Sequence, residues 1–229
     1  MNCLLCQAPL STALTLEKIF SFQKVRPPRA CAKCLSQFKP LLDCQTCRVC
    51  GRRAVDLSDD TCLDCHKWRQ QFPYPFVNQA LFEYNAAMKD FMKQYKFLGD
   101  YRLRAVFNQL VTARLKQSGR LIVTVPIHPN TFEERGFNQV LGLCEGVQTV
   151  SCLKTCQITK HTRQSEKDRA ARLQTAQPFE FVEPAGSLIR GKAIIIVDDV
   201  YTTGTTIRHA ASLLYQAGAN SVTGLTLAR

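Results

Sequence analysis

The chain has 229 residues, 45% of them hydrophobic, and a formal net charge of +12. This length accommodates a core domain of about 150 residues and a smaller module, and the hydrophobic content excludes a disordered chain. No stretch reaches the roughly 20 apolar residues of a membrane span, and the start lacks the basic head and apolar run of a signal peptide. We therefore expect a cytoplasmic protein, in which twelve cysteines indicate metal binding rather than disulfides.

The cysteines gather at the start of the chain, where nine of the twelve precede residue 66. A C-x-x-C turn directs two thiolates to one point, and two such turns complete a tetrahedral zinc site. Sequential pairing predicts two structural zinc sites, the first at Cys3, Cys6, Cys31 and Cys34 and the second at Cys47, Cys50, Cys62 and Cys65. A crossed pairing, or a single occupied site, stays open. Cys44 and His66 are spare candidate ligands.

These cysteines predict a zinc-binding module over residues 1–66, whose role is structural because four thiolates leave no open coordination position. Residues 66–77 contain Pro73 and Pro75 and predict an extended connector. The resulting division is a module at 1–66, a connector at 67–79 and a larger domain at 80–229.

The larger domain alternates strand and helix patterns. A short strand is expected at 80–84, then two amphipathic helices, from Met88 to Tyr95 and from Leu103 to Leu115, separated at residues 97–100. Strands follow at 121–127, 153–158, 179–182, 193–200 and 221–228, with helices at 133–146 and 207–216. This order predicts an α/β fold, a parallel sheet flanked by helices with right-handed crossovers.

The stretch from Ala193 carries the strongest functional signal. A β-branched run predicts a buried strand, and it leads to an acid pair, Asp198 and Asp199. A threonine-rich loop follows and opens a helix: Thr202, Thr203, Gly204, Thr205 and Thr206. Adjacent carboxylates are costly unless a cation or hydroxyls join them, whereas a helix N-terminus binds anions. A sugar diol on the acids with a phosphate on the loop satisfies both features, at the strand edge where such sheets bind ligands.

This stretch resembles the phosphoribosyl pyrophosphate (PRPP) motif of type I phosphoribosyltransferases. Further motifs stand in the order found in the ComF/GntX family: Cys47-Arg-Val-Cys50-Gly-Arg, Tyr95-Lys96-Phe97-Leu98-Gly99-Asp100, Val125-Pro126-Ile127-His128-Pro129 and Arg135-Gly136-Phe137-Asn138-Gln139. The chain is similar to that family over nearly its whole length. The resemblance implies a phosphoribosyltransferase-like domain behind a cysteine-rich module, and a role in natural competence, the uptake and handling of single-stranded transforming DNA. It also makes a competence helicase a plausible partner.

The resemblance assigns roles to three loops. The acid pair would accept the ribose hydroxyls of PRPP, and residues 202–206 would hold its 5′-phosphate. Pro126, Ile127 and His128 lie where such enzymes hold pyrophosphate with Mg²⁺. Lys160, His161 and Arg163 fall in a basic stretch, 159–172, that resembles the mobile loop over the reacting centre. Arg135 and Asn138 either line the cleft or serve helix capping and packing.

One position separates the chain from purine-salvage members of the fold, which carry an Asp general base where this chain has Thr202. Orotate-type members have Thr there. Catalysis and the acceptor therefore stay open: the possible activity is phosphoribosyl transfer to an unknown acceptor.

The positive charge is concentrated. Residues 89–120 hold eight Lys or Arg against two Asp, and residues 154–172 hold six against one Asp and one Glu. Such a surface favours a polyanion. Lys93, Lys96 and Arg102 stand among Tyr95, Phe97 and Tyr101, a mixture that fits base stacking on a single strand; the alternative is a solvated lysine face with core aromatics.

Three functions fit these observations. The first is a competence factor that binds single-stranded DNA and PRPP. The second is a metabolic phosphoribosyltransferase with orotate-like chemistry. The third is a non-catalytic sensor, in which PRPP occupancy regulates partner contacts.

Overall fold

The structure is a computed structural model of the chain and describes residues 1–10, 27–42, 44–53, 60–156, 177–183 and 185–229. No helix in these ranges has both the length and the apolar character needed to cross a membrane.

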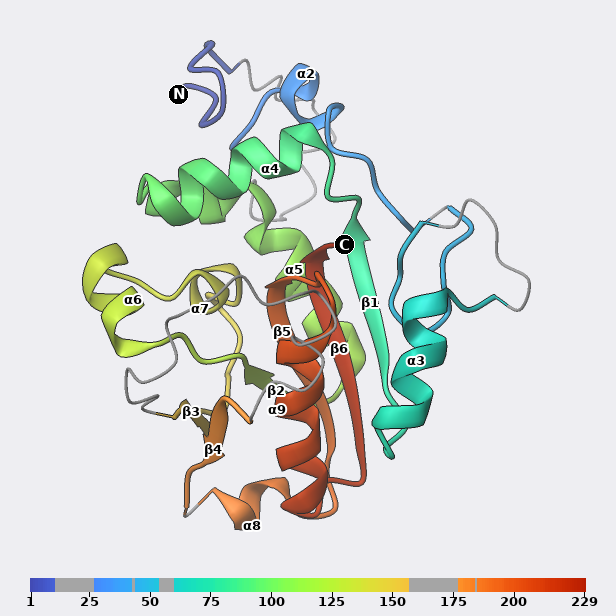
Figure 1. The fold of residues 1–229 in the computed structure, drawn as a ribbon. Coiled ribbons are helices and arrows are strands. Elements are labelled where there is room, and N and C mark those ends of the chain that lie inside the picture. Colours follow the sequence, from blue (N-terminus) through green and yellow to red (C-terminus); the bar gives the residue numbers. More distant parts are fainter. Residues whose placement is uncertain (11–26, 43, 54–59, 157–176, 184) are drawn as a thin grey trace, which may run out of the picture.

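A four-stranded parallel sheet forms the centre of the molecule (Figure 1). Its strands are β1 (Val77–Phe82), β2 (Leu121–Thr124), β5 (Ala193–Val200) and β6 (Ser221–Ala228), in the spatial order β1-β6-β5-β2. Every neighbouring pair runs parallel, and Asp198 of β5 lies opposite Thr226 of β6. The carboxyl ends of all four strands therefore meet at one edge, as the alternation of elements predicted.

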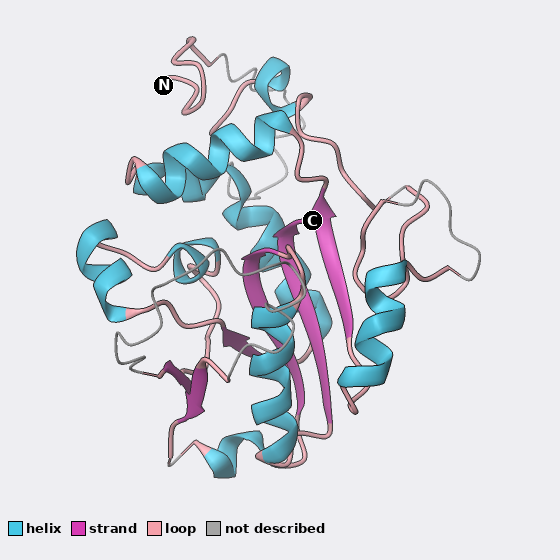
Figure 2. Ribbon diagram, in the orientation of Figure 1, coloured by secondary structure: helices cyan, strands magenta, loops and turns pink. Residues whose placement is uncertain are grey.

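Helices cover both faces of the sheet (Figure 2). On β5, Ile194 and Ile196 belong to one core cluster, with residues of α9 (Thr205–Gln216). Ile195 and Val197 belong to the other, with residues of α4 (Ala86–Met92) and α5 (Arg104–Ser118). Alternate side chains of a strand point to opposite faces, so a continuous apolar run here marks a strand buried on both faces.

The predicted pair of helices between β1 and β2 is confirmed, with a detail that the periodicity could not show. Helix α4 continues into a π-helical turn, η1 (Lys93–Phe97), and a 3-10 turn, η2 (Tyr101–Leu103), precedes α5. A π-helical turn shifts the facing of the side chains that follow it and is frequent at functional sites.

Other expectations were wrong in extent. The connector that we expected to be extended from residue 66 is helical in its first half, because α3 (Leu63–Gln71) begins directly after Cys62 and ends before Pro73. The helix expected at 133–146 is two short helices, α6 (Pro129–Arg135) and α7 (Gln139–Leu143), divided at Gly136, whose φ of +80° ends the first.

The strands expected near 153 and 179 are also short and lie outside the main sheet. They are β3 (Leu153–Thr155) and β4 (Phe179–Phe181), which pair with each other antiparallel. Helix α8 (Gly186–Ile189) then leads back to β5.

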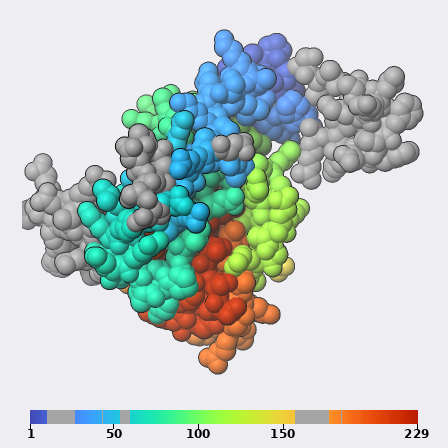
Figure 3. Space-filling model, turned by 90° about the vertical axis from the view of Figure 1, so that its right-hand side faces the viewer, coloured from blue at the N-terminus to red at the C-terminus, as the bar shows by residue number. Residues whose placement is uncertain are grey.

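The cysteine-rich residues spread over the domain (Figure 3). Near the N-terminus, a short helix, α2 (Ala32–Leu35), leads to Phe38, which is buried in the α4–α5 core cluster against the rings of Phe91 and Phe107. Cys47, Cys50, Cys62 and Cys65 instead belong to the α9 core cluster. Phe38, which follows the first cysteine group, and the second group itself therefore pack in the core clusters on opposite faces of the sheet.

Candidate functional site

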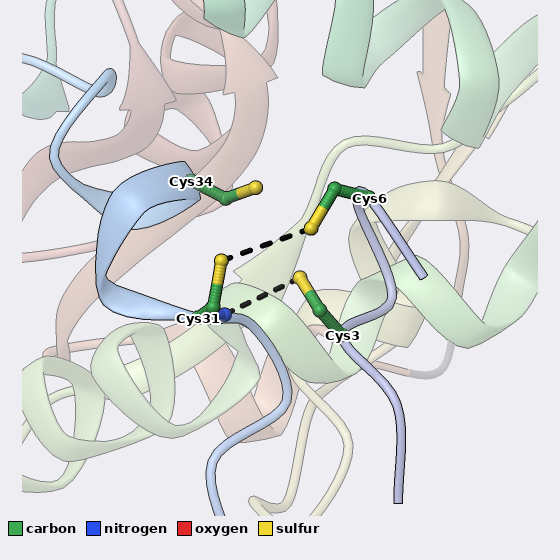
Figure 4. A group of neighbouring side chains, drawn as sticks. All are labelled: Cys3, Cys6, Cys31 and Cys34. Atoms are coloured by element: carbon green, nitrogen blue, oxygen red, sulfur yellow. Dashed lines mark hydrogen bonds between the residues drawn. The ribbon is translucent and has the colours of Figure 1, made fainter. Parts of the chain in front are cut away.

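The sulfur atoms form two groups of four in the sequential pairing. Cys3, Cys6, Cys31 and Cys34 make the first group (Figure 4), and Cys47, Cys50, Cys62 and Cys65 make the second, with all sulfurs of a group within 4.8 Å of one another. Sulfur separations of 3.8 Å (Cys6–Cys31) and 3.7 Å (Cys50–Cys62) match the edge of a tetrahedron, about 3.8 Å for Zn–S bonds of about 2.3 Å. The donor sets therefore fit zinc.

An equivalent backbone contact in each cysteine group supports this interpretation. The N–H of Cys31 donates to Cys3 Sγ at 3.3 Å, and the N–H of Cys62 donates to Cys47 Sγ at 3.3 Å. Such bonds stabilise thiolates, the form that binds metal. Cys44 and His66, the spare candidates, lie in neither group, and the Cys44 thiol donates to the Pro40 carbonyl at 3.6 Å.

The acid pair lies at the carboxyl end of β5, as predicted. Asp198 Oδ1 accepts a hydrogen bond from the Asp199 N–H at 2.8 Å, and Asp199 Oδ1 accepts one from the Val200 N–H at 2.6 Å. The two carboxylates are therefore fixed by the backbone of the strand end. Burial, and then the charge of Asp199, raise the pKa of Asp198 to about 8.

A cation reaches the acid pair from the π-helical turn. Lys96 Nζ lies 2.5 Å from Asp199 Oδ2, and the side chains are only 18% and 6% exposed. Of the three residues that we predicted as nucleic-acid contacts, Lys93 is exposed and Arg102 pairs with Asp100 at 2.8 Å. Lys96, by contrast, already has a partner at the acid pair.

The aromatic residues near Lys96 also differ: two pack within the protein and one is exposed. Tyr95 is fully buried and donates to the Gln139 carbonyl at 2.8 Å, and Tyr101 packs on the Phe137 ring. Phe97 is 77% exposed, so its ring is accessible from solvent.

The threonine loop, residues 202–206, starts α9. Gly204 is the N-cap with φ of +85°, and a side chain there would overlap the Tyr201 ring, so this position requires glycine. Thr203 Oγ1 and Thr205 Oγ1 are hydrogen-bonded at 2.9 Å. The Thr205 N–H donates to Thr203 Oγ1 at 3.4 Å. The other N–H groups of the first turn, together with the adjacent hydroxyls, suit an anion.

Three side chains that the sequence did not single out support this loop. Trp68 of α3 donates through Nε1 to the Thr203 carbonyl at 2.9 Å. Arg229 donates to the carbonyls of Tyr201, at 3.1 Å, and Thr202. Arg208, 4% exposed, lies against the Trp68 ring at 5.0 Å. One signal was available: Trp68 stands three residues after Cys65, on the same helix face.

The loop after β2 is half-buried and includes Pro126, Ile127 and His128. His128 caps α6, because its Nδ1 accepts from the Asn130 N–H at 3.3 Å. Asn138 caps α7, because its Oδ1 accepts hydrogen bonds from the N–H groups of Val140 and Leu141. Of the two roles considered for Asn138, lining the cleft or capping a helix, the structure shows capping. Lys160, His161 and Arg163 lie outside the described residues.

Comparison with known proteins adds independent information. The phosphoribosyl transferase domain family matches residues 149–229. The chain is 34% identical to competence protein ComFC of Streptococcus pneumoniae, over 100% of both chains. It is 29% identical to competence protein ComFC of Bacillus subtilis, over 99% of this chain and 94% of that one. A DNA utilization protein, YhgH of Salmonella typhimurium, is 27% identical over 96% of this chain and 93% of its own length.

Among solved structures, glutamine phosphoribosylpyrophosphate amidotransferase from B. subtilis is similar, with a TM-score of 0.39, 21% identity, and coverage of 59% of this chain and 30% of that one. The full-length sequence similarity is the stronger result. The chain belongs to the ComFC family of competence-associated, phosphoribosyltransferase-like proteins.

Proposed function

We propose that the protein binds PRPP with Mg²⁺ at the acid pair and the threonine loop, and handles single-stranded DNA during uptake. The observation that carries this proposal is the placement of two fixed carboxylates directly before an anion-binding helix start. Asp198 and Asp199 would accept the ribose hydroxyls, and residues 202–206 would bind the 5′-phosphate through backbone N–H groups and hydroxyls. Mg²⁺ would balance the charge of the pyrophosphate.

Lys96 supports the proposal from the other direction. Two carboxylates at one strand end repel each other, and the free protein offsets this with an ammonium group at 2.5 Å. A diol that donates to the same oxygens would take over part of this role. We therefore expect the Lys96 ammonium to move away from Asp199 when the ribose hydroxyls of PRPP bind there.

Calorimetric titration with PRPP and MgCl₂, with and without a single-stranded oligonucleotide, tests the proposal. We expect binding that Asp198→Asn with Asp199→Asn abolishes while the zinc content stays unchanged, because amides remove the acceptor charge but leave the cysteine groups intact. Unchanged PRPP affinity in this double variant would refute the assignment.

Catalysis is a separate question. Thr202 supplies no carboxylate for proton removal, so transfer would depend on the acidity of the acceptor, as in orotate-like chemistry, and the non-catalytic sensor is the remaining alternative. Release of pyrophosphate from PRPP in the presence of orotate would favour transfer. PRPP binding that alters affinity for DNA without pyrophosphate release would favour the sensor.

A further inference from the structure

A cavity lies beside the threonine loop, where the turn after Cys50 meets the carboxyl ends of β1, β5 and β6. Its volume is about 370 Å³, and its lining includes Arg52, Arg53, Tyr84, Thr202 and Arg229, together with Glu83, Val200 and Tyr201. This volume is at the lower end of the range of about 300–1,000 Å³ for small-molecule sites. The cavity thus has room for a group the size of a nucleotide.

Arg52 and Arg53, which follow the Cys47–Cys50 turn, are held in place by backbone hydrogen bonds and by ion pairs. Arg52 follows Gly51, and its carbonyl accepts from the Cys47 N–H at 2.8 Å. The same turn is tied to β1, because the Asn78 N–H donates to the Val49 carbonyl at 2.8 Å. Both guanidinium groups are held in place by acids, Arg52 by Asp64 at 2.9 Å and Arg53 by Glu83 at 3.2 Å, yet they remain 43% and 52% exposed.

The rest of the lining includes residues at the ends of β5 and β6. Arg229 lies 4.8 Å from the Tyr201 ring and donates to two carbonyls of the neighbouring loop. Its buried Nε has no partner among the described residues. The lining therefore holds three arginines and one acid, Glu83, while Asp64 pairs with Arg52 beside it. Tyr84 adds an aromatic ring in a residue that is 43% exposed.

This chemistry favours a nucleotide within a single strand. Guanidinium groups bind phosphate oxygens in a planar, two-point manner, and an exposed tyrosine ring stacks bases regardless of sequence. A nucleotide of a duplex could not enter such a cavity, since its base is already paired and stacked. The positive lining with one aromatic residue combines the two features of single-strand sites.

We propose that this cavity is a binding site, called the seat below, for a phosphate and a base of single-stranded DNA. Arg52 and Arg53, which follow the turn of the second cysteine group, form it together with Tyr84 and Arg229. The proposal deepens the DNA-handling function and rests on it. It places DNA next to Thr202, so a strand and PRPP would occupy adjoining sites. It also gives the second cysteine group a role in holding two binding residues.

Fluorescence anisotropy with a labelled oligothymidylate, over a series of salt concentrations, tests the seat. Arg52→Gln with Arg53→Gln should weaken binding about tenfold and reduce the slope of log affinity against log salt by about 1.4, the value for two phosphate contacts on a single strand. The matched control is Arg190→Gln with Lys192→Gln. It removes the same charge from two exposed residues just before the amino end of β5 and should change the slope much less.

Glu83→Gln separates binding from structure. If Arg53 faces a phosphate, removing its acidic partner strengthens DNA binding about two- to fivefold, in contrast to Arg53→Gln. If the ion pair is only structural, both single variants weaken binding equally, which would overturn the proposal. Because Glu83→Gln keeps every arginine, it carries the test even if the arginine variants fold poorly.

The remaining outcomes are also distinct. Equal losses in the cavity variant and the control variant would mean diffuse charge attraction and would overturn the seat, while DNA handling stands. Wild-type protein that binds no oligothymidylate would overturn both the seat and the DNA-handling function. A cooperative urea unfolding transition of the same wild-type preparation, followed by Trp68 fluorescence, verifies that the protein is folded in either case.

Discussion

Removing the ammonium group from the acid pair should destabilise the free protein strongly. Lys96→Met replaces a lysine that lies 2.5 Å from Asp199 and is 18% exposed. Breaking a fully buried ion pair on one side costs about 3–5 kcal/mol, because the other charge stays buried and unpaired. Since Lys96 is partly accessible to water, we expect a loss near the lower limit, about 3 kcal/mol.

The loss should depend on pH in a defined direction. Burial and the charge of Asp199 raise the pKa of Asp198 to about 8, so the Asp198 carboxyl is largely protonated near pH 6 and largely ionised near pH 9, where it adds a negative charge to the acid pair. Lys96→Met should therefore cost more free energy of unfolding at the higher pH. The opposite order would contradict the electrostatic explanation.

Urea unfolding followed by the fluorescence of Trp68, the single tryptophan, measures these values. A double-mutant cycle with Asp199→Asn isolates the pair, and we expect a coupling energy of about 2 kcal/mol. Lys93→Met, in the same helical turn but exposed, is the matched control and should stay within about 0.5 kcal/mol of wild type. Additive effects of Lys96→Met and Asp199→Asn would refute the reasoning.

Two further predictions concern the threonine loop and the acid pair. Trp68→Phe removes the 2.9 Å hydrogen bond to the Thr203 carbonyl, which is worth about 1 kcal/mol. PRPP affinity measured by calorimetry should therefore fall about fivefold, while the zinc content stays unchanged. An unaltered affinity would mean that the loop keeps its shape without the indole. Asp198 has a folded-state pKa of about 8, above its unfolded value of about 3.9, so it binds its proton more tightly in the folded state. Its contribution to stability is lost as the pH rises from about 4 through about 8. Urea unfolding of Asp198→Asn should show a flatter pH profile, and an unchanged profile would place the titration elsewhere.

The sheet and the acid pair could be predicted because their signals are local. The apolar run before Asp198 needs burial on both faces, and the alternation of elements leaves few topologies for it. The cysteine pairing was equally accessible, since each C-x-x-C turn fixes its own geometry and the gaps between turns allow sequential closure.

What the sequence could not show depends on contacts between distant residues. Nothing near Lys96 indicates that its ammonium reaches Asp199, because the π-helical turn that directs it has no sequence signature. The prolines at 73 and 75 predict an extended connector from residue 66, although they stand beyond the end of α3 at Gln71. Arg229 and Arg52 meet across one cavity only after β1 and β6 have paired.

The hydrogen bond from Trp68 to Thr203 spans 135 residues of sequence, and this separation has a consequence for synthesis. At about 5–20 residues per second, the helix that follows Cys62 waits about 7–27 s before its partner loop leaves the ribosome. During that interval the second cysteine group has no core to cover it, and its thiols are open to oxidation. Metal bound by these four thiolates before the rest of the chain folds over them would protect them from oxidation.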